Sequence, residues 1–190
     1  MTQSKTLRRW ELALLLGVAL AALLGVWLDG AQAALSDRVI RLHVLANSDS
    51  EADQALKLRV RDAVLAEAEE LFVPGAGRAE TEELLRAHLY DLAAAGAEVV
   101  GEAGYSYPVT ASLVHDYWFP PKTYTDFALP AGAYTALRIE IGAGGGQNWW
   151  CVVFPPLCLG SVSETTQETA LEAGLTENQV SLMTGEDEGY

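Results

Sequence analysis

The chain has 190 residues, a length that suits one domain with appendages. Half of the residues are apolar, which is enough for a hydrophobic core, while 26 acidic against 12 basic residues give a formal net charge of −14. Because nucleic acids and anionic membranes both attract basic surfaces, this charge argues against either of them as a partner of the protein surface.

The N-terminus has the three-part layout of an export signal. Basic residues within 5–9 precede an uncharged apolar run over residues 12–28, and Ala31-Gln32-Ala33 then provides the small residues that signal peptidase requires. This layout predicts a signal peptide over residues 1–33. An uncleaved membrane anchor is the alternative, because the run is at the short end of what spans a bilayer. Either way, the basic residues keep the N-terminus in the cytoplasm and place the rest outside.

The first half of the exported part predicts one strand and two helices. Residues 39–46 alternate, with Ile40, Leu42 and Val44 on one face and Arg41 and His43 on the other. The polar residues 47–50 then suit a turn and a helix N-cap. Helical periodicity follows over about residues 51–72 and 79–100, with Pro and Gly between the two segments.

The second half predicts three further strands. Residues 105–116 and 133–141 alternate between apolar and polar side chains, and a proline-containing loop separates them. The glycine-rich residues 142–147 predict a turn, because no helix and no Lys-Ser/Thr pair follow as a phosphate loop would require. Residues 148–154 are apolar and rich in β-branched and aromatic side chains, which favours a buried strand.

These elements predict an α+β domain over residues 37–160. We expect a small, mainly antiparallel sheet of about four strands with two helices packed on one face. Residues 161–190 contain seven acids and no Lys or Arg, so we expect an acidic, mostly disordered tail.

The sequence contains no convincing catalytic, metal or cofactor motif. Residues 47–53 resemble a calcium loop in their spaced oxygens, but Ala52 and Leu58 stand where such a loop has its glycine and its bidentate glutamate. A serine nucleophile such as Ser48 with His115 as base lacks the local motif that would support it. We therefore predict no enzyme activity, no metal and no cofactor.

Two features of residues 148–158 suit binding or stabilisation. Cys151 and Cys158 flank a proline bend, so they form either a disulfide across that bend, which persists outside the cytoplasm, or two small buried thiols. Trp149 and Trp150 point to opposite faces of the predicted strand. One of them is expected in the core and the other at a partner surface, where tryptophan is over-represented.

Two blocks of sequence carry a resemblance to a known family. They are IRLHVLANSDSEADQALKLRVRDAV, residues 40–64, and LPAGAYTALRIEIGAGGGQNWWCVVFPPLC, residues 129–158. Both resemble stage II sporulation protein R of endospore-forming Firmicutes, and the likeness extends in order over about residues 37–160.

The resemblance implies a signalling role. Proteins of this family are exported from the forespore into the space between forespore and mother cell. There they activate a membrane-embedded aspartic protease of the mother cell, which removes the pro-sequence of pro-sigma-E. The partner would then be the extracytoplasmic part of this protease. The chain would contact the membrane only through its N-terminal signal or anchor.

The motif positions are the candidates for partner binding. They are Asn47, Ser48, Asp49, Asp53, Asn148, Trp149, Trp150, Phe154, Pro155 and Pro156. A secreted cell-wall hydrolase and a peptidoglycan-binding module, with an exposed tryptophan as a platform for sugars, remain the alternative functions.

Overall fold

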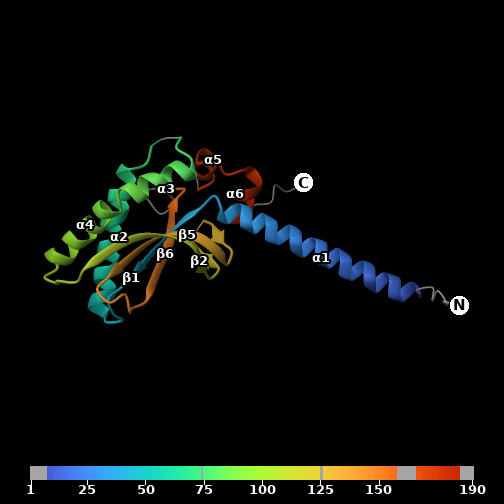
Figure 1. Cartoon of the computed structure of the whole chain (residues 1–190), viewed down its shortest axis with the longest axis horizontal. Coiled ribbons are helices and arrows are strands. Elements are labelled where there is room, and N and C mark those ends of the chain that lie inside the picture. Colours follow the sequence, from blue (N-terminus) through green and yellow to red (C-terminus); the bar gives the residue numbers. More distant parts are fainter. Residues whose placement is uncertain (1–7, 74, 125, 158–165, 185–190) are drawn as a thin grey trace.

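The structure is a computed structural model that describes residues 8–73, 75–124, 126–157 and 166–184 (Figure 1). The helices are α1 (Arg9–Ser36), α2 (Glu51–Glu70), α3 (Arg78–Ala87), α4 (Leu89–Glu102), α5 (Thr166–Glu172) and α6 (Glu177–Thr184). The strands are β1 (Ile40–Leu45), β2 (Val109–Phe119), β3 (Lys122–Thr123), β4 (Ala128–Leu129), β5 (Gly132–Ile141) and β6 (Asn148–Phe154).

The domain is α+β, and its main sheet has four strands in the order β2-β5-β1-β6. β2 pairs antiparallel with β5, and β6 pairs antiparallel with β1, as expected for most of the sheet. The central pair, β1 with β5, is parallel, so the sheet is mixed. A parallel pair needs a long crossover, and here α2, α3, α4 and β2 all lie between the two strands in the chain.

Helices α2 and α4 cover one face of the sheet. The predicted alternation places Ile40, Leu42 and Val44 of β1 on this face, together with Leu137 and Ile139 of the neighbouring β5. All five side chains are completely buried against residues of α2 and α4. This layer is the larger of the two hydrophobic cores, and it is the one that the sequence pattern predicts.

The opposite face of the sheet is also buried, which the sequence pattern did not indicate. Phe119, Leu129 and Tyr134 lie in a second core with residues from α1, α5 and α6. All six residues of β1 are therefore buried, including the polar Arg41 and His43. The alternation assigned these two to the other side of the strand correctly, but it carries no information on what covers that side.

The second predicted helix is in fact two. α3 ends and α4 begins at His88, where φ is −107° and ψ is 17°, outside the helical region. Both Leu85 and Leu92, on either side of the break, are completely buried. The apolar period continues through the interruption, so periodicity alone could not reveal it.

Two segments of the predicted disordered tail are helical. Ala170 of α5, Leu175 between the helices, and Val180 and Met183 of α6 are buried in the second core. The mostly disordered tail stays a prediction as a whole, while its described residues 166–184 include these two short helices. Residues 158–165 and 185–190 lie outside the described part of the chain.

The N-terminal apolar segment forms α1, which projects from the domain in Figure 1. Residues 9–26 are long and apolar enough to cross a membrane, a test that a signal sequence also passes. The last turn of α1 packs on the domain: Leu35 is buried, the side-chain amide of Gln32 donates to the carbonyl of Ala131, and Gln179 Nε2 donates to the carbonyl of Ala34 over 3.1 Å. The helix is consistent with a signal sequence, and cleavage after Ala33 stays a prediction.

Candidate functional site

The polar turn after β1 is organised around the carboxylate of Asp53. Asp53 Oδ2 accepts hydrogen bonds from Asn47 Nδ2 at 2.9 Å and from Ser48 Oγ at 2.6 Å. Ser50 caps α2, its hydroxyl accepting from the backbone N–H of Asp53 at 3.2 Å. The predicted N-cap is confirmed. The polar side chains of the turn form hydrogen bonds with one another.

The same turn binds the glycine-rich turn between β5 and β6. Asn47 Oδ1 accepts from the N–H of Ala143 at 3.0 Å, and Asp49 Oδ1 accepts from the N–H of Gln147 at 2.7 Å. The buried Lys57 of α2 donates to the carbonyl of Gln147 at 3.0 Å. We call residues 46–53 and 142–147 together the two-turn unit, because each turn completes the hydrogen bonds of the other.

Two glycines permit the close approach of these turns. Gly142 has φ +59°, and a Cβ there would overlap the side-chain amide of Asn47. A Cβ on Gly146 would overlap the backbone carbonyl of Ser48, while the N–H of Gly146 donates to the carbonyl of Ala46 at 2.9 Å. The run of glycines is therefore a packing requirement at these two positions.

The two tryptophans of β6 lie on opposite faces of the sheet, as predicted. Trp149 packs against the first core, and the guanidinium carbon of Arg61 lies 4.7 Å from the centre of a Trp149 ring. Trp150 packs against the second core, where a ring of Trp150 is 6.3 Å from that of Phe119. Both are partly buried, so each contributes to a core and neither is a fully exposed platform.

Asn148 and His43 connect β6 to β1 on the second face. The amide oxygen Oδ1 of Asn148 accepts from His43 Nε2 at 2.8 Å. Burial lowers the pKa of His43 below its usual value of 6.5, although the bond to Asn148 opposes that shift. Neutral His43 is thus part of the interior, whereas Asn148 itself is exposed.

The proline segment after β6 lies beside a cavity of about 260 Å³. Phe154 and Pro156 line it together with Phe72, Val73 and Ala173. Phe154 and Pro155 are buried and Pro156 is partly buried, so only a small part of this motif faces solvent. Cys151 is also buried, but Cys158 is outside the described residues, and the disulfide therefore stays a prediction.

The two sequence blocks that form the two-turn unit lie within one family match. The family model of stage II sporulation protein R matches residues 36–164. The chain belongs to this family. Stage II sporulation protein R of Bacillus subtilis (strain 168) is 39% identical over 124 residues, which are 65% of this chain and 55% of that protein. The chain thus matches about half the length of this curated relative, and no solved structure gives a significant match.

Membership of the stage II sporulation protein R family implies a role in sporulation for this chain. The family match does not indicate a catalytic family. In the described part of the chain, no three His, Cys, Asp or Glu side chains gather in a way that could hold a metal ion. Of the ten candidate positions, Asp49 and Asn148 are the exposed ones, and the other side chains are partly or fully buried. Partner binding by these ten positions stays a prediction.

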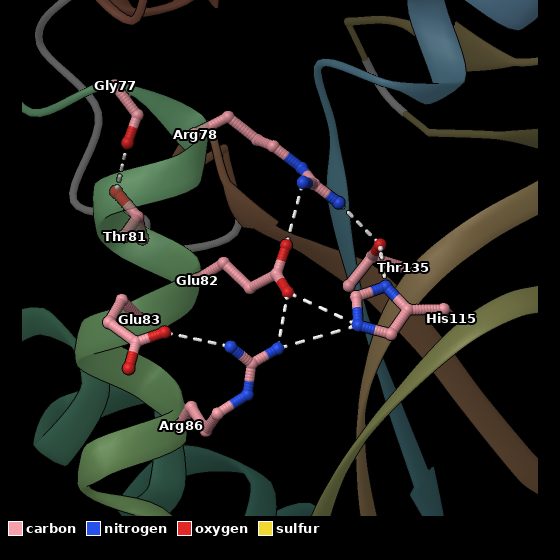
Figure 2. A network of polar contacts seen from close by, with 8 residues as sticks. All are labelled: Gly77, Arg78, Thr81, Glu82, Glu83, Arg86, His115 and Thr135. Atoms are coloured by element: carbon pink, nitrogen blue, oxygen red, sulfur yellow. Dashed lines mark hydrogen bonds and ion pairs between the residues drawn. The ribbon is translucent and has the colours of Figure 1, made fainter.

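A second polar network, which the sequence reasoning missed, joins α3 to the sheet (Figure 2). The nearly buried carboxylate of Glu82 accepts from Arg78 at 2.7 Å and from Arg86 at 2.6 Å, and His115 Nε2 lies 3.3 Å away. Arg78 also donates to the hydroxyl of Thr135 in β5. The spacing of four residues between Arg78, Glu82 and Arg86 was a visible signal for ion pairs on one helix face. The contacts of these helix residues with His115 of β2 and Thr135 of β5 could not be recognised from the sequence.

The hydrogen bonds of Asp53 give the two-turn unit a testable pH dependence. The hydrogen bond from Ser48, and to a smaller extent the one from Asn47, holds the pKa of Asp53 below its usual value of 3.8. A carboxylate whose pKa is lower in the folded state than in the unfolded state stabilises the fold at pH values above its pKa in the unfolded state. That stabilisation is lost as the pH falls through the folded pKa.

We therefore expect the free energy of unfolding, measured by urea denaturation, to decrease as the pH falls below about 4. In Asp53→Asn this part of the decrease should disappear. The exposed Asp62 of the same helix provides the control, and Asp62→Asn should keep the wild-type pH profile. An unchanged profile in Asp53→Asn would show that the carboxylate does not hold the turn.

Proposed function

We propose that this protein is an exported signalling protein of sporulation. It activates a membrane-embedded aspartic protease of the mother cell, which then processes pro-sigma-E. Membership of the stage II sporulation protein R family over residues 36–164 carries this proposal. The apolar N-terminal helix supports it, because it suits delivery to the extracytoplasmic space where the receptor would be met.

The exposed edge of the two-turn unit is the receptor-binding surface that we propose. Asp49 lies there, and the exposed Asn148 of β6 directly follows Gln147, whose backbone N–H donates to Asp49. Their neighbours Asn47, Ser48 and Asp53 are bound to one another and act by holding the surface in shape. A rigid polar edge of this kind suits recognition, since little ordering is required on binding.

Co-expression in a vegetative host tests the function. The chain is produced with the receptor protease and pro-sigma-E, and processing is followed by immunoblot. We expect processed sigma-E only when the chain is present. Processing that is equally efficient without the chain would rule out the proposal, and binding of the chain to isolated cell wall in the same cells would favour the peptidoglycan-binding alternative.

Asp49→Asn separates the charge of the surface from its structure. The asparagine side chain keeps an oxygen that can accept from Gln147, but the buried Lys57 loses the opposite charge of Asp49, so we expect a loss of stability of about 1 kcal/mol, which leaves the domain folded. We expect processing of pro-sigma-E to fall about tenfold, which corresponds to the loss of about 1.4 kcal/mol of receptor binding. The control Asp91→Asn changes an exposed carboxylate on α4. Equal processing by both variants would place the receptor-binding surface elsewhere.

A further inference from the structure

Arg41 is a completely buried cation at the centre of the sheet. It lies on β1, and its guanidinium carbon is 4.1 Å from the ring centre of Phe119 and 5.0 Å from that of Tyr134. Its exposed fraction is 0%. The Arg41 side chain makes one hydrogen bond within the described residues, from Nη2 to the hydroxyl of Tyr124 at 3.2 Å.

The remaining donors around this cation have no acceptor. Arg41 Nε and Nη1 are buried and unpartnered among the described residues, and so is Trp150 Nε1. Both side chains contact Phe119, and the Tyr124 hydroxyl that accepts from Arg41 also donates to the carbonyl of Trp150 at 3.3 Å. Three buried nitrogen atoms with unused N–H groups therefore belong to two side chains that lie against one aromatic ring.

No acidic side chain of the described residues neutralises Arg41. The carboxylate of Glu140, on the neighbouring strand, is bound to Arg138 at 2.9 Å. His43 Nε2 donates to Asn148, and because burial lowers the pKa of His43, the ring stays neutral and its other nitrogen is an acceptor. The contacts that Arg41 makes are with the rings of Phe119 and Tyr134 and the hydroxyl of Tyr124.

A guanidinium keeps its charge in every protein environment, and burying it without a counter-charge is unfavourable. Stacking on aromatic rings offsets only part of that cost. A carboxylate is the group that best matches guanidinium donors, and an indole N–H can complete its hydrogen bonds. Because the Arg41 side chain is completely buried, a ligand bound to it has to be small.

We propose that Arg41 and Trp150 bind one small carboxylate, of the size of formate or acetate, in the second core. The bound anion neutralises Arg41 and accepts the unused N–H donors of the two side chains. Since it binds only the folded domain, it stabilises the fold in a concentration-dependent way.

Thermal unfolding of the full chain in detergent tests this inference. Sodium formate is titrated against sodium chloride at equal ionic strength, and the unfolding midpoint Tm is recorded. We expect a saturable rise that is specific to formate, about 2 to 4 °C at a concentration about five times the dissociation constant. A midpoint that is the same in formate and chloride overturns the proposal without reference to any variant.

A matched pair of arginine variants locates the effect. Arg41→Met removes the charge but keeps an apolar side chain of similar length, a replacement that buried cations often tolerate. Arg61→Met removes the arginine that stacks on Trp149 at the other face of the sheet. The formate effect should vanish in Arg41→Met and persist in Arg61→Met, and a persistent effect in Arg41→Met would assign the anion to another site.

Discussion

Replacing Gly146 by alanine is expected to destabilise the domain by about 3 kcal/mol. The added Cβ would overlap the backbone carbonyl of Ser48, which cannot move away as a flexible side chain can. Separating the turns to relieve this overlap would also break the bond from the N–H of Gly146 to the carbonyl of Ala46. Urea denaturation of wild type and variant measures the difference.

Gly145→Ala is the matched control, one residue earlier in the same turn. A Cβ at Gly145 would meet the carbonyl of Asn47 at 3.5 Å, an ordinary van der Waals contact. Its effect should stay within about 0.5 kcal/mol of wild type. Equal losses for the two variants would mean that the turn is sensitive to any side chain and that the close approach at Gly146 is not the cause.

Removing the carboxylate of Glu82 is the second change with a large expected effect. In Glu82→Ala the guanidinium groups of Arg78 and Arg86 lose their shared partner, and α3 loses its carboxylate contact with His115 of β2 (Figure 2). We expect a loss of about 2 to 3 kcal/mol in the free energy of unfolding, because charged hydrogen bonds at a nearly buried site are broken.

The neighbouring Glu83 shows what an exposed ion pair contributes. Its carboxylate binds Arg86 at 2.8 Å but is 73% exposed, against 9% for Glu82. Glu83→Ala should therefore change stability by less than about 0.5 kcal/mol. If urea denaturation gives similar losses for both variants, burial is not what makes the Glu82 network stabilising.

The strands and the first core follow from local patterns. The predicted range of β6, residues 148–154, agrees with the structure, and the alternation of β1 correctly separates Leu42 from His43. These features depend on near neighbours in the chain, which periodicity records. The burial of Arg41 depends on α1, α5 and α6 instead, and no pattern within β1 indicates it.

The two-turn unit could not be predicted for the same reason. Asn47 and Ala143 are far apart in the chain, and their hydrogen bond exists because β1 and β6 are neighbours in the sheet. The sequence identified both turns as unusual and offered them as partner-binding segments. The structure shows in addition that most of their polar side chains bind one another.

A binding measurement tests most directly the claim that this protein acts by binding the receptor protease. The full chain in detergent is titrated onto the immobilised extracytoplasmic part of the protease, and the dissociation constant is measured for wild type, Asp49→Asn and Asp91→Asn. We predict saturable binding that Asp49→Asn weakens about tenfold and Asp91→Asn leaves unchanged. Absence of binding by a folded wild-type chain would contradict the account.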